Sequence, residues 1–118
     1  MIVCVAGSRF IRDRHTVWHH LEGVRDRLYE VDLLIHGACQ GVDEYAHMWA
    51  EMAGIPVKQY PAKWCLHGPA AGPIRNQDMA KACDVLVAFP MKGNPNKGTM
   101  DMIRLARAQK KHAIVIEL

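Results

Sequence analysis

Three glycine-containing segments, each following an apolar run, are the parts of this sequence best suited to bind an anion. They are residues 7–9 (GSR), 36–41 (HGACQG) and 90–99 (PMKGNPNKGT). Glycine leaves backbone N–H groups open to a ligand, and serine, threonine and arginine side chains donate hydrogen bonds to phosphate oxygens. The three segments therefore predict a site for a phosphate-bearing small molecule.

Arg75 is a further candidate for binding phosphate. It lies two residues after Pro73, which suits the first position of a helix. A positive charge in the first turn of a helix is unfavourable by up to about 1 kcal/mol, because it faces the positive end of the helix dipole. An arginine that works against its local context suggests a functional partner, and pairing with Asp78 is the simpler alternative.

Two carboxylates and one aromatic side chain complete the candidate site. Asp43 either offsets the dipole of the helix after segment 36–41 or holds a ribose hydroxyl. Asp101 is the candidate acid–base group if the protein is an enzyme, and Trp64 either stacks on a base or covers the core. The full set of candidate ligand-binding residues is Gly7, Ser8, Arg9, Gly37, Ala38, Gly41, Asp43, Trp64, Arg75, Asn76, Pro90, Gly98 and Thr99.

The sequence carries neither the G-x-G-x-x-G fingerprint nor a Walker A pattern. The adjacent histidines 19–20 and the C-x-H at 65–67 are weak metal-ligand pairs, so we expect no metal and no cofactor. The four cysteines have no C-x-x-C spacing, and we expect free thiols, with Cys4 and Cys83 in the core.

Apolar runs predict the strands that would position these segments, at residues 2–6, 31–35, 57–60, 85–89 and 113–117. Patterns typical of helices lie at residues 13–29, 42–53, 73–83 and 99–110. The expected apolar side of the helix at 42–53 includes Met48, Trp49 and Met52. Asp13 is the expected N-cap of the first helix, and Gly54 the residue just past the end of the second. Residues 61–72 are expected to form a long turn-rich loop.

Strands that alternate with helices along the whole chain predict an α/β fold. We expect a Rossmann-like three-layer α/β/α arrangement with a five-stranded parallel sheet in the order 3-2-1-4-5. Ligands of such folds bind beyond the carboxyl ends of the strands, where the strand order reverses. That rule brings the three glycine segments to one edge of the sheet. At 118 residues, we expect a single domain over residues 1–118.

Composition narrows the classes of function. The net charge of +3 permits an anionic ligand but does not demand a nucleic acid. No run approaches the ~20 residues of a membrane span, and the chain does not open on a secretory segment, so we expect a cytoplasmic protein.

Six segments in order resemble the SLOG superfamily and, within it, the YspA-like (YpsA-related) branch. They are GSR at 7–9, HGACQGVDEYA at 36–46, GIPVKQYPAKW at 54–64, AGPIRNQDM at 71–79, DVLVAFP at 84–90 and KGTMDMIRLA at 97–106. The resemblance covers nearly the whole chain and implies a sensor or sequestering domain for a nucleotide or nucleotide-derived ligand. Relatives often pair through helices beside the site, so a homodimer is expected, with an exposed Trp18 or Trp49 as its marker.

Two other activities in the superfamily remain alternatives. Lonely-Guy phosphoribohydrolases carry R-x-x-x-M followed by P-G-G-x-G-T-x-x-E, and the matching residues here are Arg75, Met79, Pro90, Gly98 and Thr99. The catalytic Glu falls at Met102, which cannot do acid–base chemistry. Cleavage of an N-glycosidic bond would therefore depend on Arg75 to steer the phosphate and on Asp101 or Asp43 as the acid–base group. DprA, another relative, binds single-stranded DNA. The basic residues at 9, 12 and 14 and the basic C-terminal part keep that less favoured alternative open, although a solvated helix face explains these charges more simply. The C-terminal basic residues are Lys92, Lys97, Arg104, Arg107, Lys110 and Lys111.

Overall fold

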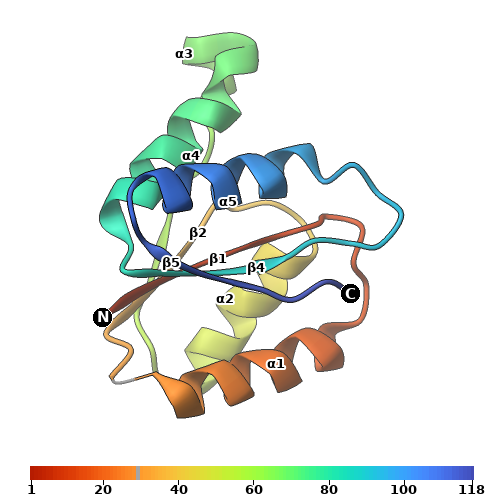
Figure 1. Ribbon diagram of the computed structural model, residues 1–118, viewed down its shortest axis with the longest axis vertical. Helices are drawn as coiled ribbons and strands as arrows, with labels where there is room; N and C mark the ends of the chain where they lie inside the picture. Colours follow the sequence, from red (N-terminus) through yellow and green to blue (C-terminus); the bar gives the residue numbers. More distant parts are fainter. Residues whose placement is uncertain (29) are drawn as a thin grey trace.

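The computed structural model describes residues 1–28 and 30–118 and contains a five-stranded sheet with helices on both faces (Figure 1). The strands are β1 (Ile2–Gly7), β2 (Leu33–His36), β3 (Val57–Gln59), β4 (Val85–Phe89) and β5 (His112–Val115). They pair in parallel in the order β3-β2-β1-β4-β5. The predicted α/β fold and strand order are therefore confirmed.

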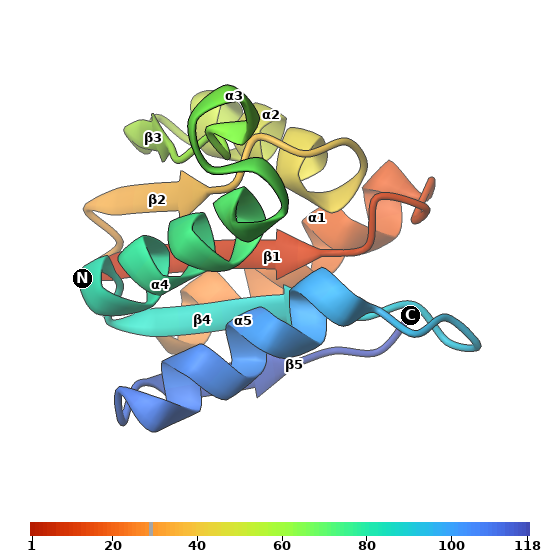
Figure 2. The same cartoon turned by 90° about the horizontal axis from the view of Figure 1, so that it is seen from above.

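Helices form the two outer layers. They are α1 (Arg14–Arg27), α2 (Val42–Met52), α3 (Trp64–His67), the 3₁₀ turn η1 (Gly68–Ala70), α4 (Ala71–Ala82) and α5 (Lys97–Ala108). Helices α1 and α2 cover one face of the sheet, and α4 and α5 cover the other (Figure 2). As predicted, Asp13 caps α1, because its carboxylate accepts a hydrogen bond of 3.1 Å from the backbone N–H of Thr16.

Alternation along the strands divides the core into two parts. Val3 and Val5 of β1 pack with α1 and α2, whereas Cys4 packs with α4 and α5. All five residues of β4 are buried, as the continuous apolar run predicts for a strand covered on both faces. Cys4 and Cys83 are buried, as expected. No helix among the described residues has the length and apolarity that crossing a membrane requires.

Residues 61–72 are not the long loop predicted from the sequence. They contain α3 and η1, and α4 begins at Ala71 rather than at Pro73. The helix starts early because the first N–H groups of a helix need no intrahelical acceptor, so proline is tolerated within the first turn. Arg75 is consequently the fifth residue of α4 and lies beyond the first turn. The prediction that its charge opposes the helix dipole is therefore wrong.

The buried face of α2 is narrower than its apolar pattern predicts. Met48 and Met52 are 40% and 66% exposed, whereas Trp49 is only 5% exposed. Trp18 is half-buried, and its indole N–H donates to the backbone oxygen of Tyr45 at 2.7 Å. Neither tryptophan is therefore the exposed marker of a dimer that the sequence suggested. The predicted end of the first helix, Tyr29, lies outside the described residues.

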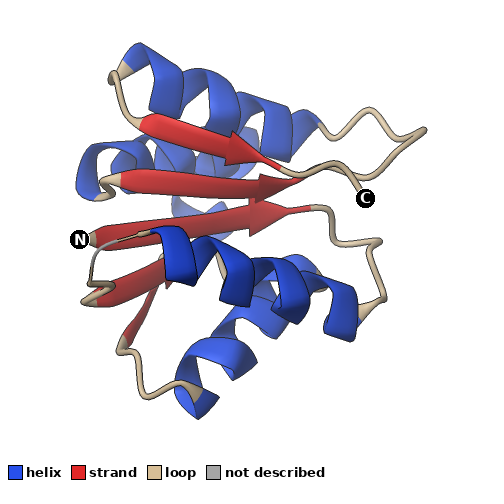
Figure 3. Ribbon diagram, turned by 60° about the horizontal axis from the view of Figure 1, so that its bottom comes forward, coloured by secondary structure: helices blue, strands red, loops and turns tan. Residues whose placement is uncertain are grey.

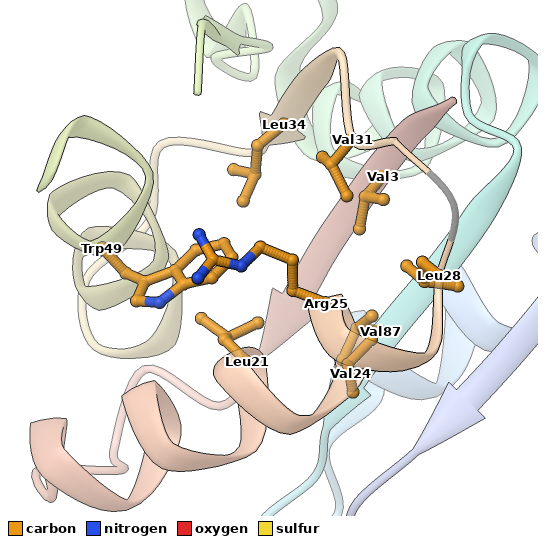
Figure 4. A pocket seen from close by; sticks show the side chains of 9 residues that line it. All are labelled: Val3, Leu21, Val24, Arg25, Leu28, Val31, Leu34, Trp49 and Val87. Atoms are coloured by element: carbon orange, nitrogen blue, oxygen red, sulfur yellow. The ribbon is translucent and has the colours of Figure 1, made fainter. Parts of the chain in front are cut away.

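A small hollow lies between α1, α2 and the sheet (Figure 4). Its volume is about 10 Å³. The side chains that line it are Val3, Leu21, Val24, Arg25, Leu28, Val31, Leu34, Trp49 and Val87. A hollow of this size holds at most about one water molecule, and an apolar lining offers it few partners. We therefore treat it as a packing void rather than a binding site.

Candidate functional site

All five strands point toward the same edge of the sheet, where the loops after β1, β2 and β4 lie (Figure 3). Three contacts join these loops to one another and to α4. The backbone of Gly41 lies against the turn after β1, Gly37 lies against the side chain of Arg75, and Asn76 bonds to the start of α5. The structure thus brings together the segments that the sequence analysis selected.

Two glycines permit the close approach of these loops. A methyl group at Gly37 would collide with the guanidinium of Arg75, and one at Gly41 would lie 2.8 Å from the backbone oxygen of Ser8. Gly41 also has a φ of 74°, a conformation that side chains disfavour. Gly7 has a packing role, because a methyl group there would lie 2.7 Å from the side chain of Val42.

Asp43 anchors the loop after β2. Its Oδ2 accepts hydrogen bonds from the backbone N–H groups of Gly37 at 3.1 Å and Cys39 at 3.2 Å. The residue is 4% exposed, and burial raises the pKa of its carboxyl to about 7, against the opposing effects of these bonds and of Arg75. One of the two carboxyl oxygens of Asp43, the residue predicted to hold a ribose hydroxyl, is therefore engaged within the protein.

Two more amides of this loop are also bonded within the protein, whereas that of Gln40 faces no acceptor among the described residues. The N–H of Ala38 donates to Nδ1 of His36 at 2.9 Å, and that of Gly41 donates to Glu44 Oε1 at 2.9 Å. The second bond is one half of a capping box at the start of α2, in which the third helical residue accepts from the N-cap amide. The residues 37–41, which we call the β2 loop, are thus held by side chains and form a firm wall.

Arg75 links the β2 loop to the ends of two strands. Its Nη1 donates to the backbone oxygens of Gly37 and Tyr60, and its Nε donates to Asn76 Oδ1 at 2.9 Å. A guanidinium has five N–H donors, and these three bonds leave the two on Nη2, which face Cys39 Sγ at 4.0 Å. The Nη2 end is the part of Arg75 that can bind a ligand.

Asn76 connects Arg75 to the start of α5. Its amide nitrogen donates to the backbone oxygen of Gly98 at 3.3 Å and to Asp101 Oδ2 at 3.2 Å. The other carboxylate oxygen of Asp101 pairs with Arg104 at 2.8 Å. Both oxygens of Asp101, the candidate acid–base group, are therefore bonded to neighbouring side chains.

The start of α5 offers backbone donors. Asn96 precedes the helix with a left-handed φ of 53°, and its amide group bonds to both the N–H and the C=O of Met91, which closes the loop. The N–H groups of Lys97, Gly98 and Thr99 face no acceptor among the residues that the structure describes. Such free amides at the positive end of a twelve-residue helix are suited to bind an anion.

The remaining predicted residues differ in their availability to a ligand. The hydroxyl of Ser8 accepts a bond of 3.1 Å from the N–H of Phe10, and the exposed Arg9 places its guanidinium 5.4 Å from the Phe10 ring. Pro90 is buried at the end of β4. Trp64 is 59% exposed on α3, which projects beyond the helical layer (Figure 1), so it lies at the margin of the site.

Sequence reasoning missed a group of polar side chains behind the β2 loop. His36 Nε2 lies 2.8 Å from His47 Nδ1, and His47 Nε2 lies 2.8 Å from Glu51 Oε1. The i, i+4 spacing of the last two residues is a recognisable signal on a helix. The contact between the two histidines arises from the packing of α2 on β2, so no local pattern predicts it.

Comparison with known proteins identifies the family. Residues 1–67 match the model of the family described as YspA, cpYpsA-related SLOG. Gene 61 protein of Mycobacterium phage D29 is 36% identical to the chain over 95 residues, which are 75% of this chain and 76% of that protein. The chain therefore belongs to the YspA, cpYpsA-related SLOG family, as its motifs predict.

A solved structure supports the fold. The X-ray structure of DNA processing protein A (DprA) from Streptococcus pneumoniae superimposes with a TM-score of 0.57 at 16% sequence identity. The match covers 95% of this chain and 57% of DprA, so the chain spans little more than half the length of that protein. At this identity, the likeness concerns the fold alone.

Proposed function

We propose that the protein binds a nucleotide or nucleotide-derived ligand at the carboxyl edge of its sheet, as a sensor or sequestering module. The observation that carries this proposal is that the unbonded backbone amides at the start of α5 are linked to Arg75, whose Nη2 makes only a long contact of 4.0 Å with Cys39 Sγ among the described residues. The two are joined through Asn76, which bonds to both Arg75 and Gly98. Backbone donors, a helix dipole and a guanidinium together suit a phosphate group.

In this proposal the ligand lies with its phosphate on the first turn of α5. The N–H groups of residues 97–99 bind the phosphate oxygens, and Arg75 adds a positive charge. The β2 loop forms a wall beside the sugar, because four of its five amides are already bonded to protein acceptors. Trp64, which is 59% exposed, is available to stack on a base from the margin.

A panel of nucleotides tests the proposal. We expect AMP, ADP-ribose, NAD or a cyclic nucleotide to raise the melting temperature, since a ligand at 100 times its Kd adds about 2.7 kcal/mol to stability. Mass spectrometry of the purified protein under native conditions would identify a ligand that co-purifies. Melting curves that no member of the panel moves would contradict the proposal.

The hydrolase alternative receives less support from the site. Met102 occupies the position of the catalytic Glu in Lonely-Guy enzymes, and its side chain is completely buried. Asp101 is bonded to Asn76 and Arg104. Release of free base from AMP by the wild-type protein, and its loss in Asp101→Asn, would reverse this judgement.

Binding of single-stranded nucleic acid is a second candidate, which a surface feature favours. A hollow of about 310 Å³ at the start of α1 is lined by Arg12, Asp13, Arg14, His15 and Tyr45. Basic side chains beside an aromatic ring suit a nucleic-acid strand, and the name of DprA records DNA processing. With about three phosphate contacts, the affinity for an oligonucleotide should fall about tenfold or more between 50 and 200 mM salt. Affinity that does not depend on salt would exclude this mode.

Self-association completes the proposal, and we expect a homodimer. Leu66 on the projecting helix α3 is 71% exposed, which makes this helix the first surface to test. Light scattering after gel filtration should give twice the monomer mass, and Leu66→Asp should shift it toward the monomer. A wild-type protein of monomer mass at high concentration would contradict the dimer.

A further inference from the structure

A continuous chain of hydrogen bonds leads from the β2 loop to the protein surface. The N–H of Ala38 donates to His36 Nδ1, His36 Nε2 lies 2.8 Å from His47 Nδ1, and His47 Nε2 lies 2.8 Å from Glu51 Oε1. His36 is 3% exposed, whereas the side chain of Glu51 is 66% exposed. The chain therefore connects a buried imidazole to solvent through the partly buried His47.

The bonding pattern assigns the proton positions on both rings. A backbone N–H can only donate, so His36 Nδ1 must accept and the proton of His36 must be on Nε2. That proton points at His47 Nδ1, which must then accept in turn. The proton of His47 is consequently on Nε2, where it faces the carboxylate of Glu51. Both histidines are neutral in this arrangement, with the same tautomer.

The chain has no place for another proton. A proton on His36 Nδ1 would face the N–H of Ala38 and remove its acceptor. A proton on His47 Nδ1 would face the Nε2–H of His36, so two N–H groups would point at each other. This repulsion ends only if the rings separate, or if the His36 proton moves to Nδ1, the nitrogen that accepts from Ala38. The bonds to Ala38 and to His47 thus cannot both survive protonation of the pair.

Charged groups surround the chain on several elements. Arg75 of α4 bonds to Gly37, next to His36, and its positive charge opposes protonation of that ring. Asp43 of α2 accepts a hydrogen bond from the N–H of Gly37, next to His36, and Glu51 lies at the outer end of the chain. Burial, with smaller effects from His47 and Arg75, lowers the pKa of His36 to about 4.

We propose that His36, His47 and Glu51 form a proton-sensitive brace that positions the β2 loop, and that protonation of the histidine pair releases the amide of Ala38. As a statement about binding, the inference rests on the proposed function, because the β2 loop is the wall of that site. In the ligand-free protein it concerns the loop alone. The two histidines are positioning residues, since neither is placed in contact with the ligand.

Nuclear magnetic resonance of the ligand-free protein tests the brace directly. At pH 7.5 we expect the ring nitrogens of His36 and His47 to show two Nε2–H tautomers. As the pH falls from 7.5 to 3.5, the amide resonance of Ala38 should shift with the titration of the histidine pair. The amide of Leu86 in β4, which is completely buried, reports whether the fold persists. An Nδ1–H tautomer at His36 would overturn the proposal, and so would an Ala38 amide resonance whose chemical shift stays constant over this pH range.

Two substitutions at one position separate bracing from simple packing. Asn at position 47 places its Oδ1 near the site of the imidazole Nδ1, so His47→Asn should keep the Ala38 amide protected from hydrogen exchange at pH 7.5. His47→Leu offers no acceptor and should speed exchange of that amide at least tenfold. His19→Asn on the exposed side of α1 is the control and should match wild type. Equal protection in His47→Leu and wild type would contradict the brace, and if this variant does not fold, the wild-type tautomers and titration decide. Because no nucleotide is present, failure of the brace and failure of nucleotide binding remain distinguishable.

Discussion

The β2 loop and the start of α5 lie at the same edge of the sheet, and each follows a buried strand and contains glycine. They differ in what their backbone amides bond to. Within the β2 loop, Asp43, His36 and Glu44 accept hydrogen bonds from four amides, whereas three amides of α5 face no acceptor among the described residues. A glycine-containing connection after a strand is therefore not by itself a ligand loop. Its capacity to bind depends on whether the protein already supplies the acceptors.

Arg75 joins the two regions, and its loss should have the largest effect on stability. Arg75→Met leaves the buried oxygen of Gly37 and the oxygen of Tyr60 without their donor, and each lost bond to a charged group costs about 1.5–3 kcal/mol. We expect the free energy of unfolding in urea to fall by about 3 kcal/mol. Arg104→Met is the control, with an expected change of about 1 kcal/mol or less, because this exposed side chain pairs with no described residue other than Asp101. Equal losses in the two variants would show that Arg75 does not join the loops.

The glycines of the two regions should respond oppositely to alanine. Gly37→Ala drives a methyl group into Arg75, and overpacking of this kind costs about 1–3 kcal/mol. Gly98→Ala has open space around the new methyl group and lies in a helix, so it should stabilise by about 0.5–1 kcal/mol. Urea unfolding of both variants measures the difference. Destabilisation at Gly98 as large as that at Gly37 would remove the contrast between the regions.

The carboxyl of Asp43 gives the β2 loop a pH dependence of known sign. Because the folded-state pKa is raised from 3.8 to about 7, the native protein holds a proton in this range that the unfolded chain has lost. This contribution to stability is therefore complete below pH 3.8 and disappears as the pH rises through 7. Asp43→Asn removes it, so the stability of the variant relative to wild type should rise by about 1.4 kcal/mol per pH unit between pH 4 and 7. A difference that does not change with pH would contradict the buried, protonated carboxyl.

His36 acts in the opposite direction over an overlapping range. Its folded-state pKa of about 4 lies below the usual 6.5, so the unfolded chain binds the extra proton and stability is lost as the pH falls toward 4. In wild type the two effects partly cancel between pH 4 and 6.5. Unfolding of Asp43→Asn across this range should therefore expose the histidine contribution. A free energy of unfolding of Asp43→Asn that does not change between pH 4 and 6.5 would contradict the lowered pKa of His36.

The framework of the fold is predictable because it depends on local patterns. The bounds of β4 follow from its continuous apolar run, and the alternation of strands and helices gives the sheet order. Helix α3 was missed because four residues are too few to show a period. The exposure of Met48 and Met52 was missed because α2 carries apolar residues on more than one side.

The candidate site is only partly predictable. The rule for parallel sheets predicts which segments converge, but it does not predict the hydrogen-bond partner of each amide. Asp43 lies only a few residues from the amides that donate to it, so its role in anchoring the loop could have been predicted from the local sequence. His36 and His47 are 11 residues apart on different elements, and only packing brings their rings together.

The central claim is that free amides at the start of α5 bind the phosphate of a nucleotide, and a pair of variants at Gly98 tests it most directly. A Cβ added there meets nothing within 4 Å, so we expect both Gly98→Asp and Gly98→Asn to fold. A negative charge in the first turn stabilises a helix by about 0.3–1 kcal/mol but repels phosphate. We predict that calorimetric titration with AMP gives a Kd for Gly98→Asp at least ten times higher than for Gly98→Asn, although Gly98→Asp is at least as stable. Equal affinities in the two variants would contradict the claim.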